Sequence, residues 1–374
     1  MEENKKNKVP NVPNLRLSGF ENDYQKTKIG RCLKIKSGQD QKGICCDNGK
    51  YKIFGTGGVI GTTNFFLYDK ESVGIGRKGT IDKPFFFDEP FWTVDTLFYS
   101  VIYKGFSPKY IYYLFQTINW KKYNSSTGVP SLTSSTIESI DISIPSLEEQ
   151  CKVSKFLTLI DQRIETQNKI IEKLESLKIG IKERIYLLGK TKEPLERILH
   201  EVSEKSTVQN QYPVLSSTVK GLFLQSEYFD RAIASENNIG YKIVHKGQII
   251  ISPQNLWMGN LTFNDKYESG IVSPSYKIYE IDSKYSKKYI HWLLTSKRSF
   301  FNYGLVSEQG ASIVRRNLNI DAFMELCLPI IKDKDDESKI ENLIDLIEKK
   351  LESEKKRGTL LNQQKQFLLS NLFI

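Results

Sequence analysis

The sequence is poor in the side chains from which metal centres and disulfide frameworks are usually built. Its 374 residues include five cysteines and three histidines. They lie at Cys32, Cys45, Cys46, Cys151 and Cys327 and at His200, His245 and His291. The cysteines are too few and too scattered for a disulfide framework, and no Cys-x-x-Cys pair indicates zinc. We therefore expect ordinary thiols, structural histidines and no metal site in this chain.

Long apolar runs are also absent. No segment approaches the roughly 20 apolar residues that a membrane-spanning helix needs. The N-terminus, MEENKKNKVP, is charged and polar, whereas a secretion signal has an apolar core. These absences predict a cytoplasmic protein with no membrane partner.

Motifs of common enzymes are missing as well. The sequence has no GxSxG elbow, no HExxH and no Asn/Asp-Pro-Pro-aromatic motif. Residues 74–79, GIGRKG, match GxGxxG, but a dinucleotide fingerprint must open a helix, and the β-branched and aromatic segment TIDKPFFFDEP follows. We interpret these glycines as hairpin turns. The absences favour a binding protein, and an enzyme with an unrecognised site is the less favoured alternative.

Two long charged segments carry apolar residues at coiled-coil spacing. Steps of four and three give a seam from Val153 to Leu188, which Gln167 and Lys178 interrupt. A period of 3.5 residues keeps one stripe facing a partner helix. At a rise of 1.5 Å per residue this helix is about 50 Å long. Its partner should be another helix of similar length.

A second seam from Ile340 to Leu372 repeats the first at a distance of 187 residues. The polar interruptions repeat too, because Gln167 maps to Glu354 and Lys178 to Lys365. The chain is therefore interpreted as two units, each a globular region followed by a long helix. Two unrelated amphipathic helices, each docked on its own domain, are the alternative. Gly358 lies in the second seam and costs about 1 kcal/mol relative to alanine, so a kink or looser packing is expected there.

The globular regions combine short strands with amphipathic helices. Residues 31–103 are β-branched or aromatic and broken by glycines, which predicts strands and tight turns. Residues 108–123 predict a helix that begins at Pro108, and Ile140, Ile142 and Ile144 predict a strand. The second half repeats this order, with a short helix expected at 193–202.

We therefore predict an α+β fold with two mixed α/β domains and two long helices. The expected domains are 1–145, a central helix at 146–190, a second domain at 191–330 and a C-terminal helix at 331–374. The net charge of +10 divides over these as +6, +2, +2 and 0. The excess lies mainly in the globular regions, which suits domains that contact a polyanion and helices that contact protein.

Several loops carry the donors that a DNA-reading surface needs. Arg, Lys, Asn and Gln reach base edges, while cations and hydroxyls bind phosphates. The candidates in the first half are Thr56, Gly57, Arg77, Lys78, Thr80, Lys121 and Lys122. Those in the second half are Gln254, Asn255, Trp257, Asn260, Gln309, Arg315 and Arg316. Each of these residues can equally belong to a solvated turn, and Trp257 to a core.

The segments VPNLRLSGF, YKIFGTGGVIG, IGRKGTI and PFWTVDTLF, followed by ISIPSLEEQ and a long helix, resemble the specificity (S) subunit of type I restriction-modification systems. The Pro-x-Leu-x-Glu-Gln start of that helix is the most specific part. The resemblance implies two target recognition domains that each read half of a split DNA site. It also implies two long antiparallel helices, related by a pseudo-twofold repeat, that separate the domains and bind partners.

The partners that the resemblance implies are double-stranded DNA, two methyltransferase (M) subunits and restriction (R) subunits. S-adenosylmethionine, ATP and Mg would then belong to those subunits, and this chain would hold no cofactor. The second long helix starts with LPIIKDKDDESKI and lacks Leu-Glu-Glu-Gln, so the two platforms need not be symmetrical. A coiled-coil scaffold that binds only proteins is the main alternative. The sequence does not define the target site or its spacer.

Overall fold

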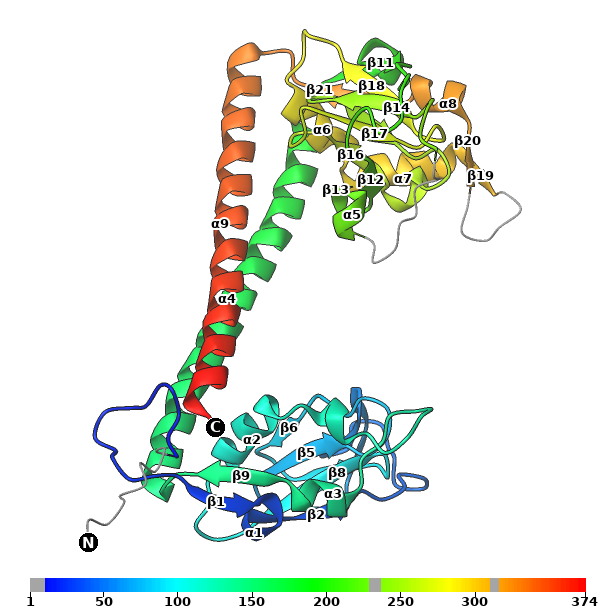
Figure 1. Cartoon of the computed structure of the whole chain (residues 1–374). Helices are drawn as coiled ribbons and strands as arrows, with labels where there is room; N and C mark the ends of the chain where they lie inside the picture. The colour runs from blue at the N-terminus through cyan, green and yellow to red at the C-terminus, as the bar shows by residue number, and fades with distance from the viewer. Residues whose placement is uncertain (1–10, 229–236, 310–315) are drawn as a thin grey trace, which may run out of the picture. The chain divides into compact units, whose positions relative to one another are not determined.

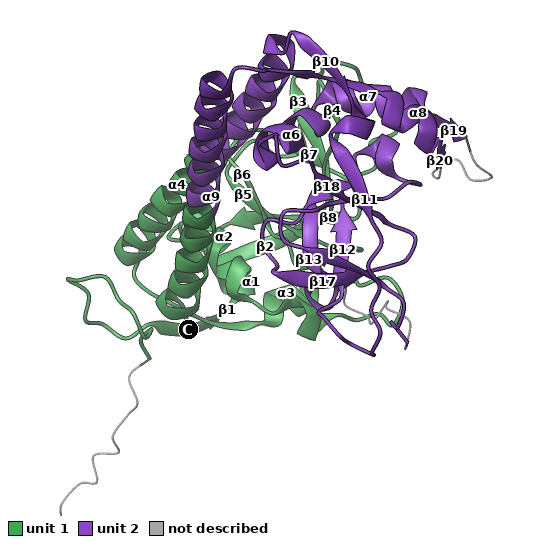
Figure 2. Ribbon diagram, turned by 90° about the horizontal axis from the view of Figure 1, so that it is seen from above, with its two compact units in different colours: residues 1–168, 356–374 green, residues 169–355 purple. Residues whose placement is uncertain are grey.

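The computed structural model describes residues 11–228, 237–309 and 316–374. The chain is α+β, as predicted, and forms two compact units (Figures 1 and 2). Unit 1 comprises residues 1–168 and 356–374, and unit 2 comprises residues 169–355. The two predicted long helices are α4 (Leu147–Leu188) and α9 (Lys334–Leu372), and each contributes a segment to both units.

Unit 1 is built on a four-stranded antiparallel sheet in the order β2-β8-β5-β6 and a three-stranded sheet in the order β4-β3-β7. A separate pair, β1 with β9, lies next to the start of α4 (Figure 1). The strands are β1 (Gln25–Lys28), β2 (Leu33–Ser37), β3 (Tyr51–Gly55), β4 (Gly58–Thr63), β5 (Ser72–Gly76), β6 (Phe85–Phe87), β7 (Phe91–Thr93), β8 (Leu97–Ile102) and β9 (Asp141–Ile144). Gly74 and Gly76 of GIGRKG lie within strand β5, so the predicted hairpin turn is wrong for these two glycines. Gly79 lies in the loop that follows, and GIGRKG opens no helix.

The helices of unit 1 follow from local signals. The helix predicted from Pro108 is α2 (Pro108–Thr117), and the Ser107 side chain accepts a hydrogen bond from the Tyr110 N–H at its N-terminus. The shorter helices are α1 (Ile29–Cys32), η1 (Trp120–Tyr123) and α3 (Ser134–Ser139). The main core joins the sheet and α2 to Val153, Leu157 and Ile160 of α4 and to Leu368 and Leu372 of α9. The predicted seam positions are therefore the ones that unit 1 buries.

Unit 2 repeats the sheet topology of unit 1. Its four-stranded sheet has the order β11-β18-β15-β16, and each strand pairs as its counterpart in β2-β8-β5-β6 does. Its strands are β10 (Thr191–Pro194), β11 (Leu199–Val202), β12 (Leu215–Thr218), β13 (Gly221–Leu224), β14 (Lys242–His245), β15 (Ile249–Ile251), β16 (Leu261–Phe263), β17 (Ser269–Val272), β18 (Lys277–Ile281), β19 (Ser307–Gln309), β20 (Arg316–Leu318) and β21 (Cys327–Ile330). Its helices are η2 (Leu195–Arg197), α5 (Gln225–Tyr228), η3 (Leu256–Met258), α6 (Lys287–Leu294), α7 (Lys297–Leu305) and α8 (Ile320–Glu325). The repeated four-stranded sheet agrees with the internal repeat that the sequence predicts, whereas the three-stranded sheet of unit 1 is replaced in unit 2 by the pairs β12-β13 and β14-β17.

The short helix predicted at residues 193–202 is wrong. This segment forms the end of β10, the single turn η2 and strand β11. Strand β10 pairs antiparallel with β21, and β11 pairs antiparallel with β18. These pairings satisfy the backbone across the sheet, and tertiary pairing outweighs a local helical preference.

Unit 2 buries the first part of the second seam and the end of the first seam, as the spacing predicts. Ile185 of α4 and Ile340, Ile344 and Ile347 of α9 share one core with Trp292 of α6. Helix α9 continues through Gly358, so this glycine does not end the helix. In the described ranges, no helix has the length and hydropathy needed to cross a membrane, and no group of three or more His, Cys, Asp or Glu is placed to hold a metal ion.

Candidate nucleic-acid interface

The β3–β4 turn of unit 1 places the hydroxyl of Thr56 close to the loop at residues 77–80. Thr56 and the exposed Gly57 form the turn, and Gly58 has a φ of 121°, a conformation that glycine adopts at little cost. A methyl group on Gly79 would lie 3.5 Å from Thr56 Oγ1. The turn and the loop that contains Gly79 therefore lie side by side.

The loop at residues 77–80 is held by its backbone while its side chains face outward. The Arg77 N–H donates to the Thr96 carbonyl at 2.8 Å, and the Gly79 N–H donates to the Pro130 carbonyl at 2.9 Å. Arg77 Nη1 donates to the Asp95 carbonyl at 3.3 Å, and its guanidinium lies 6.0 Å from the centre of the Phe98 ring. A carbonyl uses only part of the capacity of a guanidinium, so Arg77 retains donors for another molecule. Lys78 is exposed and Thr80 is half-buried beside it.

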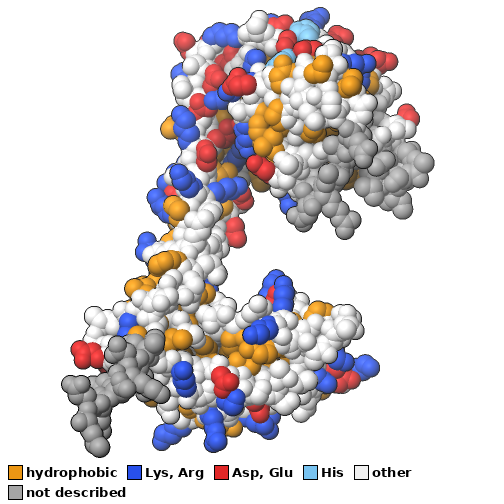
Figure 3. All heavy atoms as spheres, in the orientation of Figure 1, with side chains coloured by type: hydrophobic (Ala, Val, Ile, Leu, Met, Phe, Trp, Pro, Cys, Tyr) orange, Lys and Arg blue, Asp and Glu red, His pale blue; other side chains and the backbone are white. Residues whose placement is uncertain are grey.

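The two lysines predicted on the next loop differ in their surroundings. Lys121 Nζ pairs with Asp82 at 3.0 Å, and this hydrogen bond lowers the pKa of Asp82. Lys122 is exposed on η1. Basic side chains outnumber acidic ones on the face of unit 1 that Figure 3 shows. Lys122 is therefore the better placed of the two for a phosphate, because an internal carboxylate already engages Lys121.

The candidates of unit 2 gather where η3 meets strand β20. The guanidinium of Arg316 lies 4.2 Å from the centre of the Trp257 ring. The Arg316 N–H donates to the Gln254 carbonyl at 3.2 Å, so these three residues form one cluster. Gln254 is exposed, and the half-buried Asn255 has its Nδ2 3.3 Å from Ser252 Oγ. This cluster combines a cation, a flat aromatic surface and two amides.

Asn260, another predicted residue, does not belong to that cluster. Asn260 is buried, accepts a hydrogen bond from Ser217 Oγ at 2.8 Å and donates to the Ser217 carbonyl at 3.2 Å. Its amide therefore joins two strands and is not open to a ligand. Gln309 pairs through its backbone with Arg316 in β19–β20. Arg315 lies outside the described residues.

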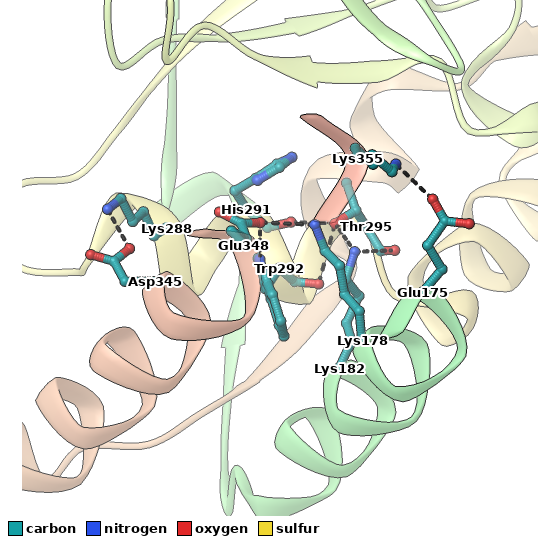
Figure 4. A network of polar contacts seen from close by, with 10 residues as sticks. All are labelled: Glu175, Lys178, Lys182, Lys288, His291, Trp292, Thr295, Asp345, Glu348 and Lys355. Atoms are coloured by element: carbon teal, nitrogen blue, oxygen red, sulfur yellow. Dashed lines mark hydrogen bonds and ion pairs between the residues drawn. The ribbon is translucent and has the colours of Figure 1, made fainter. Parts of the chain in front are cut away.

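A polar cluster that the sequence analysis did not identify fastens α6 of unit 2 to the long helices (Figure 4). Glu348 of α9 accepts hydrogen bonds from Lys178 Nζ and Trp292 Nε1, both at 2.9 Å. Burial raises the pKa of Glu348, but the bond and charge of Lys178 outweigh it, so the net shift is downward. Lys178, which interrupts the apolar seam of α4, is thus paired with Glu348 of α9.

Two further groups of this cluster are shifted by burial. Lys182 donates to the Thr295 carbonyl and to Thr295 Oγ1, and burial lowers the pKa of Lys182 to about 8. Burial also lowers the pKa of His291 to about 3, with a smaller effect from the charge of Lys182. His291 is therefore neutral at physiological pH and stacks on Phe263 at a ring distance of 5.3 Å. Lys182 thus joins α4 to the C-terminal end of α6, whereas His291 packs against the sheet.

Unit 1 contains the counterpart of this cluster. Lys365 of α9 pairs with Asp161 of α4 at 2.8 Å, and Tyr113 Oη donates to Asp161 Oδ2 at 2.8 Å. Asp161 precedes Glu348 by 187 residues, as Lys178 precedes Lys365. The repeat that located the polar breaks could therefore have located their acidic partners.

The N-termini of α2 and α6 are also fastened by equivalent residues. Gln150 Oε1 accepts from the Ser107 N–H at 2.9 Å, and Glu337 Oε1 accepts from the Ser286 N–H at 2.7 Å. Both side chains are buried, with 1% and 5% exposure, and they are 187 positions apart. The second long helix lacks the Leu-Glu-Glu-Gln sequence but keeps the function of its last residue.

A shallow apolar groove of about 580 Å³ lies on the helices of unit 1. Phe156 and Ile160 of α4 and Leu361 of α9 line it, with Arg163 and Arg357 at its margin. Leu159 is 51% exposed there. An exposed leucine beside apolar and cationic side chains is typical of a protein-binding surface.

Comparisons with known proteins agree with this arrangement. A family profile described as the type I restriction modification DNA specificity domain matches residues 21–176. Two curated relatives from Methanocaldococcus jannaschii are the specificity subunits of the type I restriction enzymes MjaIX and MjaVIII. They are 36% identical over 90 residues and 34% identical over 82 residues. These matches cover 22% and 21% of this chain, and the chain spans about a fifth of the length of either relative.

Solved structures extend the likeness to the whole fold. The S subunit of a type I restriction-modification system from M. genitalium has a TM-score of 0.63 at 17% identity, over 97% of this chain and 99% of that chain. A chain from a structural study of complex assembly in a type I system has a TM-score of 0.55 at 10% identity, over 93% and 97%. The profile and the curated relatives match part of the chain and the solved structures share its fold, so the chain is similar to the specificity subunits of type I restriction-modification systems.

Proposed function

We propose that this chain is a non-catalytic DNA-recognition subunit that reads a bipartite site and directs adenine methylation or cleavage by partner subunits. The observation that carries the proposal is that each of two similar units presents an arginine supported by an aromatic ring, with further polar side chains nearby. A split site needs two such surfaces on one chain. The likeness to type I specificity subunits suggests the type of partner.

The proposed contact residues divide by chemistry. In unit 1, we assign base edges to Arg77, because a guanidinium can donate paired hydrogen bonds. The groups assigned to phosphates are Lys78, Thr80, Lys122, Thr56 and the Gly57 backbone. In unit 2, Arg316, Gln254 and Asn255 are the groups suited to bases. Phosphate contacts fix position and base contacts select sequence, so the two kinds of variant should behave differently.

The long helices would act as spacer and platform. We propose that their length sets the number of unread base pairs between the half-sites, and that methyltransferase subunits dock on their exposed apolar surface. The groove beside Leu159 and Leu361 is a candidate for one such contact. S-adenosylmethionine, ATP and Mg would be bound by the methyltransferase and restriction subunits.

A competition assay tests the proposal. The full chain, co-purified with the methyltransferase of its own system, is mixed with a pool of random duplexes and a large excess of nonspecific DNA. A DNA-recognition subunit should enrich one split sequence and retain it under competition. A protein-binding scaffold would retain no sequence above background, and that result would contradict the proposal.

A further inference from the structure

Arg316 is restrained by contacts with two segments of unit 2, residues 254–257 and the end of α7. Its guanidinium lies 4.2 Å from the centre of the Trp257 ring. Its N–H donates to the Gln254 carbonyl at 3.2 Å, and its Nη1 donates to the Gly304 carbonyl at 3.4 Å. Gly304 lies in the last turn of α7, where exposed carbonyls favour a cation. The backbone and the side chain of Arg316 are both held before any ligand binds.

Most of the donors on this guanidinium are unused within the described residues. An arginine has five N–H donors, and the long contact with Gly304 engages one of them. No described carboxylate forms an ion pair with Arg316. Arg298 of the same unit is different, because it lies 6.0 Å from the Tyr186 ring centre and also approaches Glu183 at 3.7 Å. Arg298 is engaged within the fold, whereas Arg316 presents open donors from a fixed position.

Trp257 is better suited to be a platform than to fill a core. Its Nε1 is buried and has no hydrogen-bond partner among the residues that the structure describes, which costs stability that a phenylalanine would not lose. Tryptophan offers the strongest aromatic surface for a cation. The unsatisfied N–H is consistent with a side chain retained for its contact with Arg316.

We propose that Arg316 selects a guanine in the half-site that unit 2 reads, with Trp257 as its positioning residue. The inference rests on the proposed function of this unit. A guanidinium donates two parallel hydrogen bonds to O6 and N7 of guanine in the major groove, and no other base offers two acceptors there. Stacking occupies the face of the guanidinium and leaves its edge available for such a pair.

Selection from a random duplex library tests this assignment. The full chain, co-purified with its methyltransferase, is used as wild type, Arg316→Ala, Arg316→Lys, Trp257→Phe and Arg298→Ala. Wild type should select a split site. Arg316→Ala should lose a preference for guanine of roughly tenfold or more at one position of one half-site, with the other half-site unchanged. Arg316→Lys keeps the charge but not the paired donors, so it should lose most of that preference with a smaller loss of affinity.

The remaining two variants distinguish a loss of base recognition by Arg316 from a general loss of structure in unit 2. Trp257→Phe keeps a ring beneath the guanidinium and should weaken the guanine preference by less than Arg316→Ala does. Arg298→Ala is the matched control and should leave every position as in wild type. If Arg316→Ala and Arg316→Lys lower affinity equally for all sequences, or change no position, the inference is wrong even though the split site of the wild type upholds the proposed function. If the wild type selects no sequence, the proposed function fails and the inference fails with it.

Discussion

The two units attach the same four-stranded sheet to the long helices with different polar side chains. In unit 1 the buried Glu149 receives two hydrogen bonds from Arg16, at 2.9 and 2.8 Å, and a third from Tyr24 at 3.1 Å. The equivalent residue of unit 2, Asp336, is exposed and pairs with Lys339. In unit 1, Arg16 and Tyr24 therefore connect the segment before β1 to the start of α4. In unit 2, the described ion pair of Asp336 is with Lys339 of its own helix.

The clusters that connect α2 of unit 1 and α6 of unit 2 to the long helices also differ in their polar side chains. Where unit 2 has Lys182 within its polar cluster, unit 1 has the buried Leu369. Where Lys288 of unit 2 pairs with Asp345, the matching Lys109 of unit 1 lies 3.7 Å above the Phe86 ring, and burial lowers the pKa of Lys109. Both units share the lysine–acid pair, an aromatic donor to that acid (Tyr113 or Trp292) and the buried side chain that caps α2 or α6. These shared groups connect α2 or α6 to the long helices in both units, whereas the neighbouring side chains differ.

The largest effect is expected when both long helices are lengthened together. A heptad inserted into α4 and α9 adds about 10 Å to each helix, which corresponds to roughly three base pairs of duplex. If the helices act as a spacer, both half-sites should persist while the unread segment between them grows. Methylation-site mapping in a host with the variant system measures this. Changed half-sites at the original spacing would contradict the spacer role.

Removing the buried carboxylate of Glu149 should destabilise unit 1 strongly. Glu149→Ala leaves Arg16 without its carboxylate and a buried space beside Tyr24, which is expected to cost about 3 kcal/mol. Asp336→Ala is the matched change in unit 2 and should cost less than about 0.5 kcal/mol. Thermal unfolding of the two variants checks the difference. Equal losses would show that the N-terminal segment adds little to unit 1.

Acid should weaken unit 2 through His291. Because the folded-state pKa of about 3 lies below the ordinary value of 6.5, the unfolded chain binds the proton first, and stability falls as pH drops from about 6.5 to 3. Tyr112 occupies the matching position of unit 1 and does not titrate in this range. His291→Tyr should therefore flatten the dependence of unfolding free energy on pH across that window by several kcal/mol, since each pH unit between the folded and unfolded pKa corresponds to about 1.4 kcal/mol. An unchanged slope between pH 6.5 and 4 would assign the acid sensitivity to other groups.

The smallest effect is expected from the exposed lysine of unit 1. Lys122→Ala should weaken binding to all duplexes alike and reduce the slope of log affinity against log salt by about 1. Arg77→Ala, from the neighbouring loop, should instead change preference in one half-site only. A salt titration on a specific and a random duplex distinguishes the two. Sequence-dependent loss with Lys122→Ala would mean that this lysine reads bases.

The sequence predicted the elements whose signals are local or periodic. The seams from Val153 and Ile340 follow from spacing alone, and the start of α2 follows from Ser107 and Pro108. The segment at 193–202 was mispredicted because its strands depend on partners such as Cys327, which is more than a hundred residues away. Local preference carries no information about such pairing.

The candidate site was predictable in type but not in detail. Loops with Arg77 and Arg316 could be found by composition, whereas the burial of Asn260 depends on Ser217, 43 residues earlier in the chain. The contact of Arg16 with Glu149 joins residues 133 positions apart and has no sequence signal. Asp161 and Glu348, in contrast, were within reach of the 187-residue repeat. Repeats thus reveal polar partners that periodicity alone does not.

The most direct test of the central claim is a methylation map of a host that carries this chain with its own methyltransferase. The account predicts methylated adenines in a site made of two short half-sites at one fixed spacing. Arg77→Ala should relax one half-site, and Asn255→Ala should relax the other. A single unsplit site, or variants of both units that alter the same half-site, would contradict the assignment of one half-site to each unit.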